Sequence, residues 1–464
     1  MLLGSSGCGA AAAQVELTVP DLFSQRLLPR RALARTFRSL RYKTYRLYFF
    51  AQLISMSGTW MESVALGWLV LELTGSAMDL GITVALQFTP VLVLGPWAGL
   101  IADRMDKRRL LFFTQVAAAV FALCLGLLTL TGAVSVWVVW VLAVLTGTAT
   151  ALDSPARQTF IVEMVGRHDL ANAVGLNNVI VNASRLIGPA IAGALIARVN
   201  VASCFLVNAA SFLAMVAALL AMRPEELQRS APVRRARRQV RQGLAYAWRT
   251  VDLRVPLLMM AAVSTLGYNF SVLLPVLAKE VFGRGGGTYG AFTAAMGAGA
   301  LIGALVTAAL ARANRPLLLL STAAFGVCTV AVALAPTLTA AFVLLVPLGA
   351  AAVMFVATVT SLLQLHAAPA MRGRVMSLWS MLFLGATPLG SPLAGALAAG
   401  FGARVALACG GAATLITAVA AAAGLRRFRR HVSGCEPPAT LPDSPEGALP
   451  VPPPRTGRDR RAPH

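Results

Sequence analysis

The chain has 464 residues, of which 57% are hydrophobic and only 12% are charged, and its mean hydropathy is +0.72. A water-soluble protein of this length could not cover so much apolar surface, so the composition excludes a soluble globular protein and indicates one that spans a membrane. The net charge of +22 raises the question of nucleic-acid binding, which the placement of the basic residues decides.

Twelve apolar segments of about 20 residues each are long enough to cross a hydrocarbon core as helices. They start near Arg46, Leu80, Leu110, Val134, Ala171, Val201, Pro256, Tyr289, Pro316, Thr339, Val375 and Ala403. The sequence therefore predicts an all-α membrane protein with twelve transmembrane helices. Because their number is even, both termini are expected on the same side of the membrane.

The basic residues indicate which side that is. Four of the 40 Lys and Arg residues fall in outward-facing loops or helix ends, namely Arg198, Lys279, Arg284 and Arg404, and Arg185 lies within a span. The others all fall in loops and tails of the opposite side, which by the positive-inside rule is the cytoplasm. Both termini are thus expected in the cytoplasm, and the charge needs no nucleic-acid partner.

Residues 1–44 are predicted to form a cytoplasmic tail whose basic amphipathic segment, Arg26 to Arg46, lies along the lipid headgroups. The first span then brings Glu62 to about mid-depth, where only Arg185 of the fifth span carries another formal charge. An ionisable group at this depth costs a few kcal/mol, so it needs a partner, a water-filled cavity or a function. Two alternatives follow: a structural ion pair, or a proton site at Glu62 with a substrate-binding cation at Arg185.

The loop between the second and third spans reads Gly99-Leu-Ile-Ala-Asp103-Arg104-Met-Asp106-Lys107-Arg108-Arg109. It resembles the signature loop between helices 2 and 3 of the major facilitator superfamily of transporters, although the family usually has Gly where this chain has Asp106. In that family the loop is a conformational switch. The resemblance implies that Asp103 faces the positive end of a helix in the second half of the chain.

The same resemblance implies that Arg104 and Arg108 meet acidic groups such as Asp153 when the cytoplasmic side is closed. Asp153 belongs to the segment Asp153-Ser-Pro155-Ala-Arg157-Gln158. Together with Gly58-Thr-Trp60-Met-Glu62 and Leu73-Thr-Gly-Ser76, this segment is similar to the enterobactin-exporter and macrolide-efflux branch of the superfamily. The resemblance covers residues 40 to 425.

The fifth span contains Ser184-x3-Gly188-Pro189-x2-Ala192-Gly193, which resembles the antiporter motif of the superfamily with small residues in place of two glycines. Gly188, Pro189 and Gly193 are predicted to form a hinge that seals the cavity of an exporter. Ordinary close packing between helices would require the same small residues.

The chain divides into two similar halves. The longest polar break, residues 223–255, separates an expected N-terminal six-helix bundle, 45–222, from a C-terminal one, 256–425, and a disordered cytoplasmic tail, 426–464, follows. An internal repeat supports the division, since Gly188-x4-Gly193-Ala-Leu recurs as Gly390-x4-Gly395-Ala-Leu. Two pseudo-symmetric six-helix bundles around a central site are typical of transporters that work by alternating access.

Aromatic and neutral polar side chains within or near the spans are expected to line that site beside Glu62 and Arg185. They are Gln52, Trp60, Asn177, Asn178, Asn182, Tyr268, Asn269 and Gln364. Such a lining suits a bulky amphipathic solute. No phosphate-binding Gly-rich loop occurs, so ATP hydrolysis is not expected, and the histidines form no cluster that would bind a metal.

The sequence therefore predicts a monomeric, non-enzymatic exporter of a hydrophobic or amphipathic small molecule, such as a drug or siderophore, in the bacterial cytoplasmic membrane. Exchange for protons is expected to drive it, with membrane lipids around it and no cofactor. Uptake or facilitated diffusion by the same fold, and a transporter-like membrane sensor, remain alternatives.

Overall fold

The computed structural model describes residues 37–166, 168–227, 239–310, 313–369 and 371–433, with the backbone alone for Pro96, Leu100, Asp103, residues 239–243 and 427–433. Most of the predicted segment Arg26 to Arg46 and the tail from residue 434 onward lie outside this range. The secondary structure of the described residues is helical throughout, with no strand.

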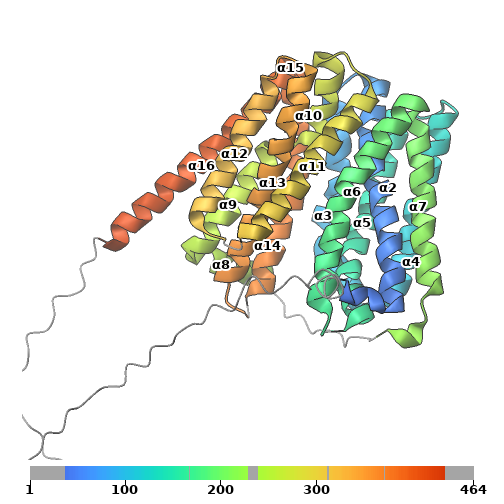
Figure 1. Ribbon diagram of the computed structural model, residues 1–464, viewed down its shortest axis with the longest axis horizontal. Helices are drawn as coiled ribbons and strands as arrows, with labels where there is room; N and C mark the ends of the chain where they lie inside the picture. The colour runs from blue at the N-terminus through green and yellow to red at the C-terminus, as the bar shows by residue number, and fades with distance from the viewer. Residues whose placement is uncertain (1–36, 167, 228–238, 311–312, 370, 434–464) are drawn as a thin grey trace, which may run out of the picture.

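The helices before the long polar break form what we call the first group. They are η1 (Arg38–Arg41), α2 (Lys43–Thr74), α3 (Ala77–Arg104), α4 (Lys107–Leu130), α5 (Val136–Val165), α6 (Leu170–Arg198) and α7 (Val201–Ala221). α2 packs along both α6 and α7, α3 along α5, and α4 along α7. The first group fills the right-hand side of Figure 1.

The helices after the break form the second group, on the left of Figure 1. Short η2 (Pro224–Glu226) lies within the break, directly below α7 on the side of the first group. α8 (Gln239–Arg249), also within the break, packs against α9 and α14 of the second group. The helices of the second group are α9 (Val251–Leu266), α10 (Phe270–Val276), η3 (Leu277–Val281), α11 (Gly286–Leu310), α12 (Arg315–Ala333), α13 (Leu338–His366), α14 (Arg372–Gly385), α15 (Thr387–Phe401) and α16 (Ala403–Ser433). α9 begins and α16 ends a few residues outside the apolar runs, because a helix continues past the charged residues that end each run.

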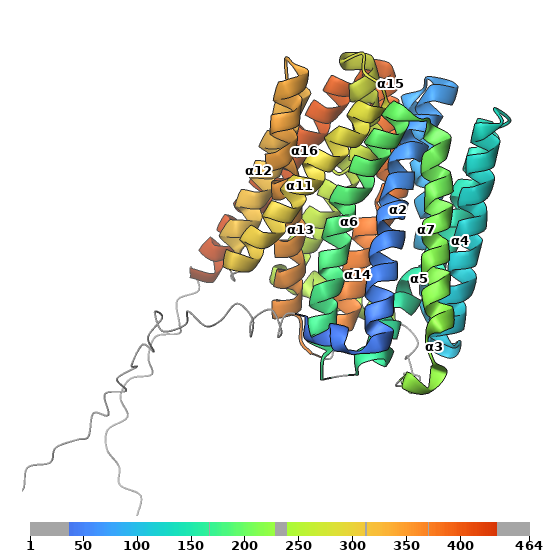
Figure 2. The ribbon, with the colours of Figure 1, turned by 45° about the vertical axis from the view of Figure 1, so that its right-hand side comes forward.

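Eleven stretches of the described chain are long and apolar enough to cross a membrane. α2 runs beside them over a similar length, as Figure 2 shows, and its 32 residues extend about 48 Å at 1.5 Å per residue. Its lower hydropathy comes from polar side chains such as Gln52, Glu62 and Glu72. With α2 the structure has the twelve crossings that the sequence predicts.

Two of the crossings are interrupted. The seventh, Val251–Val281, breaks between α9 and α10 at residues 267–269, and the eleventh, Arg372–Phe401, breaks at Ala386 between α14 and α15. Ser391 of α15 donates a hydrogen bond to Asn269 at the first break (3.5 Å). Irregular backbone at membrane depth is tolerated where protein buries it, and Asn269 is indeed buried.

Asp106 makes the tight turn between α3 and α4 possible without the usual glycine. Its backbone is extended, and its carboxylate accepts a hydrogen bond from the backbone N–H of Arg109 (3.1 Å), one of the amides that the start of α4 leaves without a helical partner. α3 therefore ends with Met105 as its C-terminal cap, and α4 begins with an aspartate cap.

The two groups contact each other most closely near one end of the molecule, where α2 turns into α3 and α15 into α16. A Cβ atom at Gly290 of α11 would lie 2.5 Å from the Cα of Gly193 in α6, and one at Gly395 of α15 would lie 2.5 Å from the carbonyl oxygen of Ala77 in α3. The hydrogen bond that joins the groups among the described residues, from Nζ of Lys279 to the carbonyl of Leu71 (2.7 Å), lies at the same end. We call this the joined end, and the opposite end, with η1, α8 and the α3–α4 turn, the basic end (Figure 1).

Candidate functional site

Helix α2 lies at the centre of the first group because two glycines let its neighbours approach. At Gly58 a side chain would collide with Asn208 and Ser211 of α7, and at Gly188 of α6 a side chain would collide with Trp60 of α2. Helix backbones come this close only where residues are small. The polar side chains of α2 are thereby pressed against α6 on one side and α7 on the other.

Glu62 faces α7. Its carboxylate accepts a hydrogen bond from the Nδ2 amide of Asn208, and the hydroxyl of Ser211 donates in turn to Oδ1 of Asn208 (2.9 Å). The Ser211 hydroxyl shares its proton between Oδ1 and the backbone carbonyl of Asn208 (2.8 Å), and with Oδ1 on this side the N–H groups of the amide point at the carboxylate. Asn208 is completely buried and Glu62 is 9% exposed.

A small cavity of about 10 Å³ lies beside Glu62, enough for about one water molecule. Its polar lining consists of Glu62, Gln87 of α3 and Thr146 of α5, and the rest of the lining is apolar: Leu66, Phe121, Leu125, Val139, Leu142 and Ala143. Glu62 is the one titratable group among these residues. The carboxyl group thus lies inside the first group, in a largely apolar setting.

Arg185 lies on the other side of α2. Its guanidinium stacks over the indole of Trp60, 5.0 Å from the ring centre, and its Nε atom is buried without a hydrogen-bond partner. Trp60 and Glu62 are two residues apart, which is about 200° around a helix of 3.6 residues per turn, so they occupy opposite faces of α2. Glu62 and Arg185 make no ion pair in the structure, since Glu62 contacts Asn208 and Arg185 contacts Trp60.

Three of the six predicted amide side chains, Gln52, Asn182 and Asn269, lie in three different places. Gln52 is buried in α2, with Nε2 against the sulfur of Met56 (3.8 Å) and no partner for Oε1. Asn182 donates to the carbonyl of Asn178 on its own helix (2.8 Å), and Asn269 donates to that of Thr265 at the break in the seventh crossing (2.8 Å). The structure does not gather them into one cluster.

The predicted switch residues of the α3–α4 turn have separate partners. Arg108 donates from Nε to the carbonyl of Leu219 (2.6 Å) and from Nη2 to that of Leu220 (3.2 Å), where α7 ends. A cation at a helix C-terminus satisfies carbonyls that have no helical partner. Gly99 is buried in α3, Arg104 is exposed at the end of α3, and the side chain of Asp103 lies outside the described part of the structure.

Asp153 and Arg157 pair with each other, four residues apart on α5. Nε of Arg157 donates to Oδ2 of Asp153 (2.8 Å), while Oδ1 accepts from Thr114 (2.9 Å) and Gln115 (2.8 Å) of α4. Nearby, Lys107 forms an ion pair with Glu163 of α5 (2.9 Å). In this conformation Asp153 binds α4 and its own helix rather than the arginines of the turn.

Two of the predicted hinge residues, Pro189 and Gly193, lie at the contact between α6 and α11, whereas Gly188 packs against α2. Gly193 touches Gly290 there, and a Cβ at Gly297 of α11 would lie 2.6 Å from the carbonyl oxygen of Arg185. Gly188 and Pro189 are buried, and α6 stays helical through Pro189. Pro189 and Gly193 therefore lie where the two groups of helices meet.

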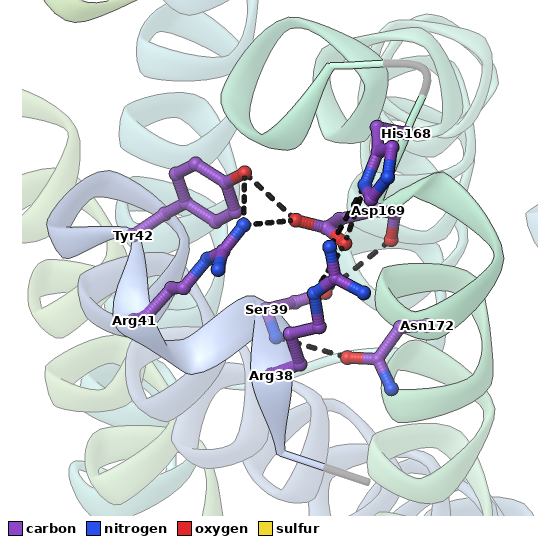
Figure 3. A network of polar contacts seen from close by, with 7 residues as sticks. All are labelled: Arg38, Ser39, Arg41, Tyr42, His168, Asp169 and Asn172. Atoms are coloured by element: carbon purple, nitrogen blue, oxygen red, sulfur yellow. Dashed lines mark hydrogen bonds and ion pairs between the residues drawn. The ribbon is translucent and has the colours of Figure 1, made fainter. Parts of the chain in front are cut away.

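The sequence analysis missed the cluster around Asp169, which Figure 3 shows. Its buried carboxylate accepts hydrogen bonds from the hydroxyl of Tyr42 (2.7 Å) and from Arg41 (2.9 Å), and it forms an ion pair with Arg38 (3.0 Å). The hydrogen bond from Tyr42, then that from His168 and the charges of Arg38 and Arg41, hold the pKa of Asp169 below its usual range. The cluster fastens η1 to the start of α6 at the basic end.

It also missed Asn208. An amide in the middle of an otherwise apolar span is a signal in itself, because a polar group at that depth needs a partner. Among the residues that the structure describes, no group of three or more His, Cys, Asp or Glu side chains could hold a metal ion.

Comparison with known proteins gives a match over most of the chain. The profile of the family described as "Transmembrane secretion effector" matches residues 34–439. The chain is 30% identical over 365 residues to the multidrug efflux pump Tap of Mycolicibacterium fortuitum. The matched region covers 76% of this chain and 88% of that protein. It is also 30% identical over 243 residues to the staphyloferrin A transporter of Staphylococcus aureus, a match that spans 51% of this chain and 59% of the relative.

Solved structures share the arrangement of helices. A bacterial homologue of the human lysosomal transporter Spinster, in an inward-facing and unoccupied conformation, matches with a TM-score of 0.65 at 16% identity, over 86% of this chain and 99% of that one. A bacterial homologue of the iron transporter ferroportin in an inward-facing state matches with a TM-score of 0.63 at 16% identity, over 82% and 98%. At these identities the similarity concerns the fold alone.

Proposed function

The chain belongs to the transmembrane secretion effector family of the major facilitator superfamily, and from this premise we propose that it exports a hydrophobic or amphipathic small molecule in exchange for protons. Membership makes it a multi-pass membrane transporter of small molecules and a carrier rather than an enzyme. Export is the activity that the names of Tap and of the macrolide efflux protein A of Streptococcus pyogenes state for those relatives. The latter is 25% identical over 159 residues, which is 33% of this chain and 39% of that protein.

One observation supports the role of protons in this proposal. Glu62 is a buried carboxyl group with an amide donor and a water-sized cavity beside it. A carboxylate in such a setting can take up a proton and become neutral, which removes the cost of a buried charge. Asn208 then loses the anion that its N–H binds, so protonation alters the contact between α2 and α7.

The solute would bind on the opposite face of α2. Arg185 and Trp60 offer a cation with an unpartnered N–H and an aromatic plane, which suits a solute with a hydrogen-bond acceptor and a flat apolar part. Because both sites use α2, a shift of this helix caused by one ligand changes the other site. We therefore propose that the proton and the solute are coupled through α2 rather than by direct competition between two charges.

Alternating access completes the proposal. The basic end would face the cytoplasm, with both termini on that side, and the joined end would face outward. In the state described here the groups are joined at the end that we propose faces outward. Export would then require the α6–α11 and α3–α15 contacts to separate while the basic end closes, with 45–222 and 256–425 moving as two bodies in a monomer.

Uptake into inside-out membrane vesicles tests the coupling. Glu62→Gln cannot take up a proton, so uptake driven by an acid interior should fall to the level of vesicles without the protein, while yield and elution in detergent stay unchanged. Glu72→Gln is the matched control, because Glu72 lies on the same helix and accepts a hydrogen bond from Trp68 (2.5 Å) away from the cavity. A full response to the pH gradient in Glu62→Gln would remove Glu62 from the mechanism, and movement only out of such vesicles would indicate uptake by the cell.

A further inference from the structure

A second and much larger cavity lies in the second group. It measures about 460 Å³, within the range of small-molecule sites in proteins. Its lining comes from the C-terminal turns of α11 and α13, from Ala313 and from the first residue of α14: Thr307, Ala308, Ala313, Thr358, Ser361, Gln364, Leu365 and Arg372. All of these segments lie toward the basic end, whereas the glycines that join the two groups lie toward the joined end.

The lining combines hydrogen-bonding groups, apolar side chains and one cation. Three hydroxyls and the amide of Gln364 can bind polar atoms, Leu365 and two alanines are apolar, and Arg372 carries the charge. No carboxylate is among these residues. A cavity of this composition favours a molecule with an anionic group and an apolar part.

Arg372 is free to bind such a group. Within the part of the chain that the structure describes, its side chain makes no hydrogen bond or ion pair, whereas Arg315 is paired with Asp252 and Arg374 donates to the sulfur of Met371 (3.1 Å). The cavity is also open from outside, since the side chains of Gln364 and Leu365 are exposed. A solute could therefore reach Arg372 without displacing a partner.

We propose that this cavity is the loading site of the exporter, where Arg372 binds the carboxylate, sulfonate or phosphate group of an amphipathic solute arriving from the cytoplasm. The proposal rests on the proposed export function for its direction, and it narrows the substrate class to organic anions. A bidentate contact from the guanidinium would hold the anionic group, and Leu365 with the alanines would receive the apolar part. The site would be on the second group alone and is distinct from Glu62, Trp60 and Arg185.

Thiol labelling of Ser361→Cys in the full-length protein tests this without transport. The purified protein is placed in vesicles of phosphatidylcholine, and modification of residue 361 is followed by mass spectrometry of the peptide that contains it. Because this peptide is detected separately, the native cysteines need not be replaced. The quantity compared is the labelling rate with the anionic reagent 2-sulfonatoethyl methanethiosulfonate divided by the rate with its cationic trimethylammonium counterpart. This ratio should be about tenfold higher with Arg372 present than in a variant that also carries Arg372→Gln. Arg374→Gln is the matched control and should leave the ratio unchanged.

Protection then reports binding. Carboxyfluorescein, an aromatic anion, should slow the labelling of residue 361 in the protein that has Arg372 but not in the Arg372→Gln variant. Cationic rhodamine 6G should affect the labelling rates of the two proteins equally. Equal reagent ratios in the two variants, or no protection by carboxyfluorescein, would overturn the proposal. Protection by adding phosphatidylglycerol to the vesicles, with none from carboxyfluorescein, would also overturn it, because the occupant would then be a lipid headgroup. Because the labelling experiment uses no pH gradient, a negative result there does not bear on proton antiport. A full pH response in Glu62→Gln likewise does not bear on the site at Arg372.

Discussion

Asn208 is the residue whose role follows most directly from its contacts. Its amide N–H stabilises the ionised form of Glu62, and Ser211 holds the amide in that orientation. We expect Asn208→Ala to let Glu62 keep its proton at higher pH, so that the midpoint of the transport–pH profile rises by about one unit, in line with the value of one hydrogen bond to a charged group.

Transport by inside-out vesicles at a series of internal pH values measures this midpoint. Ser211→Ala leaves the donor in place but frees its orientation, so it should shift the profile in the same direction by a smaller amount. An unchanged midpoint in Asn208→Ala, at normal expression, would mean that the contact is only structural.

The contacts of a site residue could be predicted from the sequence only where its partner lies a few positions away in the chain. The depth of Glu62 and Arg185 followed from counting along an apolar run, but their partners did not, because an apolar run gives depth without showing which way a side chain faces. The spacing of Trp60 and Glu62 did contain the information that they occupy opposite faces. Asn208 lies 146 positions from Glu62, and without the packing of α2 on α7 nothing links the two.

At the scale of elements, η1 is held to α6 by a charge cluster whose strength depends on pH. The pKa of the Asp169 carboxyl is lowered in the folded protein, so its contribution is present above the unfolded pKa of about 3.9 and is lost as the pH falls through the lower, folded value. At neutral pH the contribution is therefore complete. Asp169→Asn removes the charge at every pH and should release η1 at pH 7.

Hydrogen–deuterium exchange of the peptide around Ser39 measures this release. Its amide donates to Asn172 (2.9 Å) and should exchange faster in Asp169→Asn than in the unchanged protein, most clearly at neutral pH. Asp252→Asn, which removes the pair with Arg315 in the second group, serves as the control. Equal exchange at Ser39 in all three proteins would show that apolar contacts alone hold η1.

The contact between α6 and α11 gives a second prediction at this scale. Alanine at Gly290 would place its Cβ 2.5 Å from the backbone of Gly193, so α6 and α11 must separate there. We expect Gly290→Ala to make a cysteine at Ile196, a partly buried residue of α6 that lies against Gly286 of α11, react several-fold faster with a cationic thiol reagent added to the outer side of cells. Gly175→Ala on α6, whose Cβ would meet open space, should leave this rate unchanged, and an unchanged rate in Gly290→Ala would contradict the close contact.

The elements themselves were largely predictable, because runs of about 20 apolar residues and charged turns mark membrane crossings directly. The interruptions of the seventh and eleventh crossings were not. Gly267 at the first break resembles any glycine that allows close packing, and the contact of Asn269 at this break with Ser391 joins residues far apart in the sequence. Tertiary contacts of this kind leave no periodic trace in the sequence.

At the scale of the whole molecule, the close contacts between the two groups lie at the joined end, while the cavity with Arg372 opens at the basic end. In the alternating-access cycle that we propose, this arrangement would be the state in which a cytoplasmic solute can enter. The other state requires new contacts at the basic end, where Arg104 is exposed and without a described partner. Surface ion pairs are individually weak, but a few of them can shift two states that differ by a few kcal/mol.

The most direct test follows solute and protons in the same preparation. Inside-out vesicles containing the protein are energised to an acid interior, a panel of anionic, neutral and cationic fluorescent solutes is added, and solute accumulation is recorded together with a pH-sensitive dye. We predict that accumulation of an amphipathic anion is accompanied by loss of the pH gradient, and that Glu62→Gln abolishes both. Accumulation that leaves the pH gradient intact would contradict proton exchange as the driving reaction.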